Sequence, residues 1–246
     1  MAKVAGRHPV LELLKGGRKV HRLLVKYESS GEVIDEILAE ADNKGISVEK
    51  TTEREISDLA GLENHQGVLA FADDIADKNP VEVVKAASRR GKTPRLLLLD
   101  QIQDPQNFGA LIRTARAAGF QGVVYTADRS CPITPAAVKA SAGAIEHISM
   151  CQVTNLNRTL QELKDEGLWI AGADPAGDSL YYETDLSGPL GIVIGSEGEG
   201  LRRLVKENCD FLVRLPVKDR PGSLNASAAA AVMIYEALRQ SRENLD

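Results

Sequence analysis

Three short segments of the sequence bring together side chains that bind phosphates, cofactors or hydroxyl groups. The first is DPQNFGALIR at 104–113, the second is IVIGSEGEG at 192–200, and the third is LPVKDRPGSLNAS at 215–227. Glycine lets a backbone pass close to a ligand, and the amide, hydroxyl, carboxylate and guanidinium groups supply hydrogen bonds to it. Each segment alone is also consistent with an ordinary turn between a strand and a helix.

The second segment does not match the standard phosphate-binding loops. Gly195, Gly198 and Gly200 follow the order G-x-x-G-x-G. A dinucleotide-binding turn has the order G-x-G-x-x-G, and a P-loop needs Gly-Lys-Ser/Thr, which this segment lacks. Glu197 lies inside the turn, where its carboxylate is available to cap a helix or to bind a ligand. The spacing leaves a site for another cofactor and a plain turn as open interpretations.

The first and third segments each predict a capped helix. An Asp-Pro pair at 104–105 marks a turn, and Asn107 is predicted to cap the helix that follows it. Arg113 then lies one to two turns inside this helix, where a guanidinium is well placed to bind phosphate. In the third segment, Ser223 or Asn225 is predicted to cap a helix rich in alanine. The competing interpretations are a capped surface helix and a capped core helix without further function.

Strands and helices alternate from residue 96 onward, which predicts an α/β domain built on a parallel sheet. The apolar run LLLLD at 96–100 is typical of a strand buried on both faces. Ligands of such sheets bind beyond the carboxyl ends of the strands, and all three segments follow predicted strands there. The other predicted strands are 122–126, 168–173, 190–195 and 211–216, and the predicted helices are 107–120, 135–146, 156–167, 200–208 and 224–241.

A smaller α/β domain precedes this one. Its predicted strands are 21–27, 46–51 and 67–73, and its predicted helices are 32–45 and 53–60. The polar segment 73–95 contains a helical patch but is typical of a linker. We therefore predict a substrate-binding domain at 1–75, a linker at 76–94 and the larger domain at 95–246.

The charge distribution favours a polyanionic partner for the smaller domain. The net charge is −5, but residues 1–26 hold seven Lys and Arg against one acid. A local basic patch determines attraction to phosphates more directly than the net charge does. A solvated surface without a partner is equally consistent with this composition. The candidate nucleic-acid contacts are Arg7, Arg18, Lys19 and Arg22.

Several function classes are disfavoured by composition. The three cysteines are widely spaced and form no zinc-like or redox-like pair, so we expect no metal site and reduced thiols, as in a cytoplasmic protein. The first residues lack the apolar core of a secretion signal. The longest apolar runs are too short to cross a bilayer, so we expect no membrane partner.

Taken together, the three segments resemble the SpoU class of the SPOUT methyltransferases. The shared pattern is N-x-G-A-L-I-R, then I-G-S-E-G-x-G, then L-P-x(6)-S-L-N-A-S. VAGRHPVLELL at 4–14 and NHQGVLAF at 64–71 are similar to the N-terminal RNA-binding domain of the rRNA 2′-O-ribose members. The resemblance covers nearly the whole chain and is strongest to enzymes that methylate a guanosine of bacterial large-subunit rRNA. One departure is VKDRPG at 217–222, which is more charged than this class leads us to expect.

The resemblance implies an activity, a cofactor and an assembly. A methyl group passes from S-adenosylmethionine to a ribose 2′-hydroxyl, in rRNA or, as the main competing target, in tRNA. The larger domain is expected to contain a trefoil knot and to form a homodimer with the active site near its interface. Two competing hypotheses are a catalytically silent RNA-binding relative and a Rossmann-type metabolic enzyme.

The resemblance also assigns roles to residues. Because a guanidinium rarely loses its proton, Arg113 is expected to bind phosphate and polarise the hydroxyl. Ser223 and Asn225 would orient the hydroxyl, and Glu197 would position Arg113 or its own loop. The implied catalytic residues are Asn107, Arg113, Glu197, Ser223 and Asn225, and the implied cofactor-binding residues are Gly172, Gly195, Gly200, Leu215 and Leu224.

Overall fold

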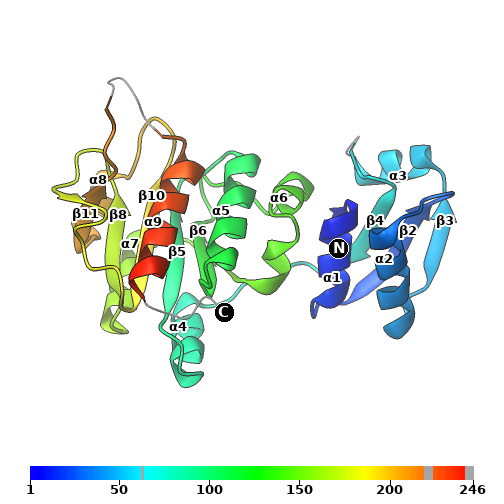
Figure 1. The fold of residues 1–246 in the computed structure, drawn as a ribbon, viewed down its shortest axis with the longest axis horizontal. Coiled ribbons are helices and arrows are strands. Elements are labelled where there is room, and N and C mark those ends of the chain that lie inside the picture. The colour runs from blue at the N-terminus through cyan, green and yellow to red at the C-terminus, as the bar shows by residue number, and fades with distance from the viewer. Residues whose placement is uncertain (62–63, 219–223, 242–246) are drawn as a thin grey trace.

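The computed structural model describes residues 1–61, 64–218 and 224–241 and shows two units joined end to end (Figure 1). The first unit is built on a four-stranded sheet and the second on a seven-stranded sheet. The two sheets share no strand. Each unit therefore has to position its own functional side chains.

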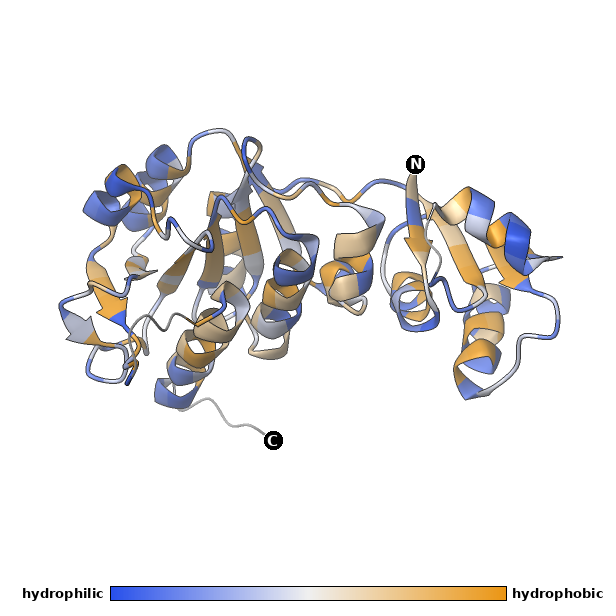
Figure 2. Ribbon diagram, turned by 90° about the horizontal axis from the view of Figure 1, so that it is seen from above, coloured by the Kyte–Doolittle hydropathy of each residue, from blue (hydrophilic) through white to orange (hydrophobic). Residues whose placement is uncertain are grey.

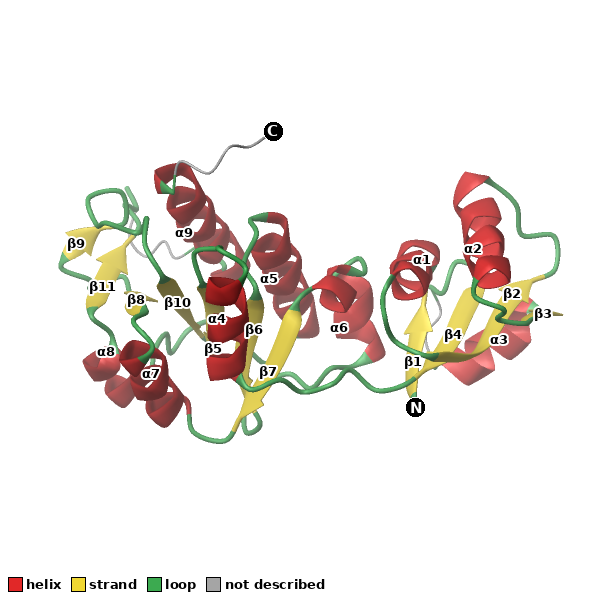
Figure 3. Ribbon diagram, turned by 90° about the horizontal axis from the view of Figure 1, so that it is seen from below, coloured by secondary structure: helices red, strands yellow, loops and turns green. Residues whose placement is uncertain are grey.

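The N-terminal unit is a mixed sheet covered on both faces. Its strand order is β1-β4-β2-β3, in which only the pair β2 and β3 is parallel. Helices α1 and α2 cover one face and α3 covers the other (Figure 3). Its elements are β1 Ala2–Ala5, α1 Arg7–Lys15, β2 Val20–Lys26, α2 Glu32–Asn43, β3 Val48–Thr51, α3 Glu53–Ala60 and β4 Val68–Ala72.

The C-terminal unit confirms the predicted parallel sheet. Its strand order is β7-β6-β5-β10-β8-β11-β9, and every pairing within it is parallel. The central strands β5 and β10 are buried along their whole length. The strands are β5 Arg95–Asp100, β6 Gly122–Thr126, β7 Ser149–Val153, β8 Trp169–Ala173, β9 Ser179–Leu180, β10 Leu190–Gly195 and β11 Phe211–Arg214.

Helices form a layer on each face of the large sheet, and the strands are its apolar centre (Figure 2). Successive side chains of β5 point to opposite faces. Leu97 and Leu99 pack in the cluster that holds α5 and α9, whereas Leu96 and Leu98 pack in the cluster that holds α4, α7 and α8. The helices are α4 Pro80–Arg89, α5 Pro105–Ala117, α6 Pro135–Ala140, α7 Leu156–Asp165, α8 Arg203–Asn208 and α9 Ala226–Gln240, with the 3₁₀ helix η1 Ala144–His147.

The two units meet where α1 faces the turn around η1. The Arg18 guanidinium lies 2.9 Å from the carboxylate of Glu146, whose side chain is 1% exposed. Burial raises the pKa of Glu146, and the nearby Arg18 opposes that shift. Glu12 and His147 form a second contact at 2.7 Å. The joint is therefore held partly by the Arg18–Glu146 ion pair and by the hydrogen bond between Glu12 and His147.

The structure adds elements that the sequence pattern does not predict. β1, α1, β7 and β9 have no counterpart among the predicted elements. The segment predicted as one helix over 135–146 is divided into α6 and η1, because Ala142 and Gly143 have φ of 49° and 86°. The helical patch of the predicted linker is α4, and its Val83 and Val84 are buried against the large sheet. The domain boundaries and the knot stay predictions.

Candidate active site

The glycine turn after β10 brings two backbone segments into direct contact. A side chain at Gly195 would place its Cβ 2.2 Å from the carbonyl carbon of Gly200. The Gly200 N–H donates to the Ser196 carbonyl at 3.0 Å, which closes the turn. Gly198 and Gly200 have φ of 92° and 69°, a region that favours glycine. The G-x-x-G-x-G order is therefore required by the shape of this turn.

The first residues of α5 differ from the prediction in one respect. The helix is capped by Asp104, whose carboxylate accepts the Asn107 N–H at 2.8 Å. Pro105 is the first helical residue, and proline favours that position because its φ is preset and it has no N–H. Asn107 therefore lies inside the first turn and is not the cap. Its side chain is left free for other contacts.

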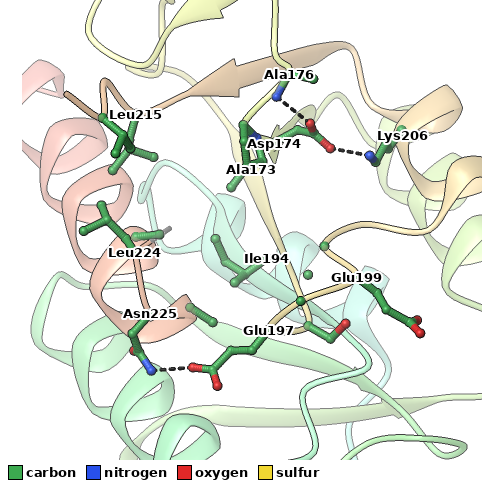
Figure 4. Close-up of a pocket in the computed structure, with 18 residues that line it drawn as sticks. Ala173, Asp174, Ala176, Ile194, Glu197, Glu199, Lys206, Leu215, Leu224 and Asn225 are labelled. Carbon is green, nitrogen blue, oxygen red and sulfur yellow. Dashed lines mark hydrogen bonds and ion pairs between the residues drawn. The ribbon is translucent and has the colours of Figure 1, made fainter. Parts of the chain in front are cut away.

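Three of the implied catalytic residues meet at this point, and Figure 4 shows the contact between two of them, Asn225 and Glu197. The Asn107 amide donates to Glu197 Oε1 at 2.9 Å, and the Asn225 amide donates to the same oxygen. Asn225 also donates to Asn107 Oδ1 at 3.0 Å. Asn225 caps α9 as predicted, because its own oxygen accepts the Ser227 N–H at 2.9 Å. The catalytic array, as we call Asn107, Glu197 and Asn225, thus joins three loops that are far apart in the sequence.

A first cavity of about 690 Å³ lies on one side of the catalytic array. Ile194, Leu215 and Leu224 form apolar parts of its wall, and the backbone of the glycine turn forms another part. Four of the five residues implied for the cofactor line it: Gly195, Gly200, Leu215 and Leu224.

Gly172 is the implied cofactor residue that does not line this cavity, so its role stays a prediction. A Cβ at this position would lie 2.8 Å from the side chains of both Cys209 and Leu201. Gly172 therefore makes room for packing under β8. The lining residues at this strand end are instead Ala173 and Asp174.

An ion pair that the sequence does not reveal shapes the far end of the first cavity. Lys206 Nζ lies 2.6 Å from Asp174 Oδ2, and Asp174 Oδ1 accepts the Ala176 N–H at 2.8 Å. Asp174 is 5% exposed, whereas the Lys206 side chain is 35% exposed. The two residues are 32 positions apart, so only the fold could bring them together.

A second ion pair connects the end of the glycine turn to strand β5. The carboxylate of Asp100, at the end of β5, is fully buried. It accepts the Arg202 backbone N–H at 2.9 Å and the Arg202 Nε–H at 2.7 Å. Because Arg202 follows closely on the glycine turn, this contact fixes the turn to the neighbouring strand.

Arg113 is not part of the catalytic array. Arg113 lies on the exposed side of α5 and lines neither the first cavity nor a second one beside it. Its predicted partner Glu197 is instead held by the two asparagines. Ser223 lies outside the described residues.

The four candidate RNA contacts do not form one free basic face. The Arg7 guanidinium donates to the Ser30 carbonyl at 3.1 Å, and the Arg22 guanidinium donates to both carboxylate oxygens of Glu49. Arg18 is engaged by Glu146. Of the four, Lys19 is the exposed residue whose side chain makes no hydrogen bond or ion pair within the described part of the chain.

Comparison with known proteins places the chain in a family. Residues 94–235 match the model of the SpoU rRNA methylase family. The chain belongs to that family. Residues 3–76 match the model for RNA 2′-O ribose methyltransferase substrate binding. The two models together match both units of this SpoU family member.

Relatives of this SpoU family member match along almost all of their length. A Bacillus subtilis protein named as a TrmH family tRNA/rRNA methyltransferase, YacO, is 38% identical over 96% of this chain and 95% of its own. A Staphylococcus saprophyticus protein of the same naming is 40% identical over the same shares.

Solved structures share the fold of this family member. The SpoU methyltransferase AviRb of Streptomyces viridochromogenes, solved with AdoMet, has a TM-score of 0.81 at 24% identity and covers 97% of this chain and 89% of its own. A TrmH-family structure from Porphyromonas gingivalis has a TM-score of 0.77 at 25% identity, covering 98% and 90%. The two-unit arrangement is thus shared along the whole chain.

The described residues contain no group of three or more His, Cys, Asp and Glu side chains that could hold a metal ion. Among the helices in the described ranges, none is long and apolar enough to cross a membrane.

Proposed function

We propose that the chain is a cytoplasmic RNA methyltransferase that uses S-adenosylmethionine to methylate a ribose 2′-hydroxyl, with a guanosine of large-subunit rRNA as its target. The observation that carries this proposal is the catalytic array beside a glycine-turn cavity, in a member of the SpoU family. The N-terminal match to a substrate-binding model supports an RNA substrate. The relatives' names include both tRNA and rRNA, so tRNA is the competing target.

The first cavity suits the proposed cofactor. Its volume of about 690 Å³ lies within the range of about 300–1,000 Å³ found for small-molecule sites. Leu215 and Leu224 offer an apolar surface to an adenine ring, and the glycine turn offers backbone groups. The carboxylate of Glu197 favours a cationic sulfonium nearby. When bound, S-adenosylmethionine supplies an electrophilic methyl group on its sulfur.

The catalytic array is arranged to orient a hydroxyl. Both asparagine amides donate to Oε1 of Glu197, which leaves Oε2 to accept from the ribose 2′-hydroxyl. Holding the hydroxyl oxygen in line with the methyl group removes much of the entropic cost of the reaction. The guanidinium of Arg113 keeps its proton, since its ordinary pKa is above about 12, and so binds the neighbouring phosphate.

We also propose a homodimer that uses the exposed sides of α5 and α9. These helices pack beside each other in Figure 1, and Val232 and Tyr235 of α9 are 36% and 51% exposed. A second copy at this face would bring Arg113 close to a subunit boundary. Sedimentation analysis of the full chain tests this directly, because Tyr235→Asp should then shift the protein toward the monomer.

The test of the activity uses rRNA and tRNA from cells that lack this gene. The purified chain and S-adenosylmethionine should add one methyl group per rRNA, located by mapping ribose methylation. Arg113→Ala should lose most of the transfer but keep the cofactor affinity, and Arg113→Lys should rescue poorly because an ammonium lacks the planar fork. Arg116→Ala, which removes another exposed arginine of α5, is the matched control.

Three outcomes would each change this proposal. Methylation of tRNA alone would move the target to tRNA. Binding of NAD without binding of S-adenosylmethionine would overturn the methyltransferase activity. Near-normal turnover of the Arg113→Ala variant would return the catalytic role to the array residues.

A further inference from the structure

A second cavity of about 550 Å³ lies on the other side of the catalytic array. Ser196, Glu197 and Glu199 line both cavities, whereas Asn225 lines only the first and Asn107 only the second. The array therefore forms a partition between two spaces. A group transferred across this partition would leave a donor in the first cavity and reach an acceptor in the second.

Gln101 gives the second cavity an unused polar group. It follows β5 directly, has a φ of 62° and is only 8% exposed. Its side-chain amide makes no hydrogen bond within the described chain. Solvent still reaches this amide, because it does not belong to the fully buried side-chain atoms that lack a partner. Gln101 lines the second cavity, so its two donors and one acceptor are available to a polar ligand there.

The carboxylates of this cavity differ in what they are free to bind. Asp104 caps α5, and Glu197 accepts from both asparagines. Glu199 makes no hydrogen bond or ion pair within the described residues. An ionised carboxylate accepts two hydrogen bonds side by side. Glu199 is thus an available acceptor for a ligand with two adjacent donors.

Arg129 provides the positive charge at this cavity. Its side chain is 70% exposed, and its one ion-pair contact within the described ranges is with the even more exposed Asp128 at 3.8 Å. An exposed pair at this distance contributes little, so the guanidinium is available to another anion. Guanidinium groups bind phosphate through two parallel hydrogen bonds.

We infer that the second cavity receives the target nucleotide with its base unstacked and selects guanine. The Watson–Crick edge of guanine has two adjacent donors, N1–H and N2–H₂, which match Glu199, and a neighbouring O6 acceptor, which matches the Gln101 amide. Adenine, cytosine and uracil each lack two adjacent donors on that edge. The ribose then lies at the catalytic array and its phosphate at Arg129. This inference rests on the proposed function and specifies its substrate.

The test measures binding of the four nucleoside 5′-monophosphates to the full chain saturated with S-adenosylhomocysteine, by ligand-observed NMR. We expect GMP to bind about tenfold more tightly than AMP, CMP or UMP, and Glu199→Gln to remove this preference, since an amide offers one acceptor. Gln101→Leu should weaken GMP several-fold. Gln106→Leu is the matched control, because Gln106 is on α5 and lines neither cavity.

A second comparison isolates the phosphate contact. Arg129→Gln should reduce the preference for GMP over guanosine, whereas Arg158→Gln, on α7, should leave it unchanged. Equal binding of all four monophosphates, no binding at millimolar concentration, or GMP affinity that is indifferent to Glu199 and Gln101 would each overturn the inference. Methylation of RNA by the same preparation tests the proposed function independently, so the two failures are distinguishable.

Discussion

Replacing Arg202 with alanine should destabilise the C-terminal unit far more than the loss of an ordinary surface arginine. The variant leaves the carboxylate of Asp100 without its guanidinium partner. Removing one member of a fully buried ion pair costs about 3–5 kcal/mol, because the remaining charge is neither solvated nor paired. Asp100 is fully buried, but the Arg202 side chain is 43% exposed, which lowers this cost. The backbone hydrogen bond from residue 202 is retained, so the expected loss is nearer the lower value.

Urea unfolding followed by tryptophan fluorescence measures the stability of the C-terminal unit. Trp169 is the single tryptophan of the chain and lies on β8, beside β10. For a unit of this size the free energy of unfolding falls by about 2 kcal/mol per molar urea. A loss of about 3 kcal/mol therefore lowers the unfolding midpoint by about 1.5 M.

The neighbouring residue supplies the control. Arg203 pairs with Glu207 at 2.6 Å, but both side chains are more than half exposed. Such a pair is worth about 0.5 kcal/mol, so Arg203→Ala should lower the midpoint by only about 0.2 M. If the two variants shift the midpoint equally, the Asp100–Arg202 pair does not anchor the turn. We also expect Arg202→Ala alone to weaken S-adenosylmethionine binding in calorimetry, because the glycine turn loses its attachment.

Three further outcomes follow from single residues. Gly195→Ala should weaken the binding of S-adenosylmethionine at least about tenfold in calorimetry, since the new Cβ would lie 2.2 Å from backbone. Gly17→Ala should leave this binding unchanged, because the space around Gly17 is open. Burial lowers the pKa of His65 below its ordinary 6.5, so near this pH the unfolded chain binds more protons than the folded chain. The N-terminal unit should therefore lose stability in urea as the pH falls through 6.5. If His65→Asn leaves the dependence of stability on pH unchanged, this reasoning is contradicted. Burial raises the pKa of Cys151 and Cys209 to about 12, so both thiols should resist iodoacetamide at pH 8 in the native protein, as mass spectrometry would show.

The sequence predicts most of the large sheet because its signals are local. A strand such as Leu190–Gly195 is an unbroken apolar run, and glycine or a polar cap separates it from the next helix. The pattern does not predict β7 because this edge strand is partly polar, and a short run of that kind is not distinguished from a loop. The 3₁₀ helix η1 depends on two left-handed residues before it, and one of them is an alanine.

The site is predictable in its residues but not in its contacts. Asn107, Glu197 and Asn225 stand out by type and spacing, yet nothing local shows that two amides share one carboxylate oxygen. The prediction of Asn107 as a cap is wrong because asparagine is only one of the residues that favour that position, and Asp104 before a proline is the stronger signal. The partner of Arg18 lies 128 residues away, so a basic cluster in the sequence does not reveal that this arginine is engaged.

The residues that form the first cavity are synthesised late. Its lining residues within the described ranges lie between 173 and 229, and they include the residues that begin α9. The four-stranded sheet is complete once β4 has emerged at Ala72. At about 5–20 residues per second, the ribosome needs roughly 8–30 s more to reach the start of α9. During that time the growing chain carries the strands of the N-terminal unit but not the first cavity, so the first unit is able to bind a partner before this cavity exists.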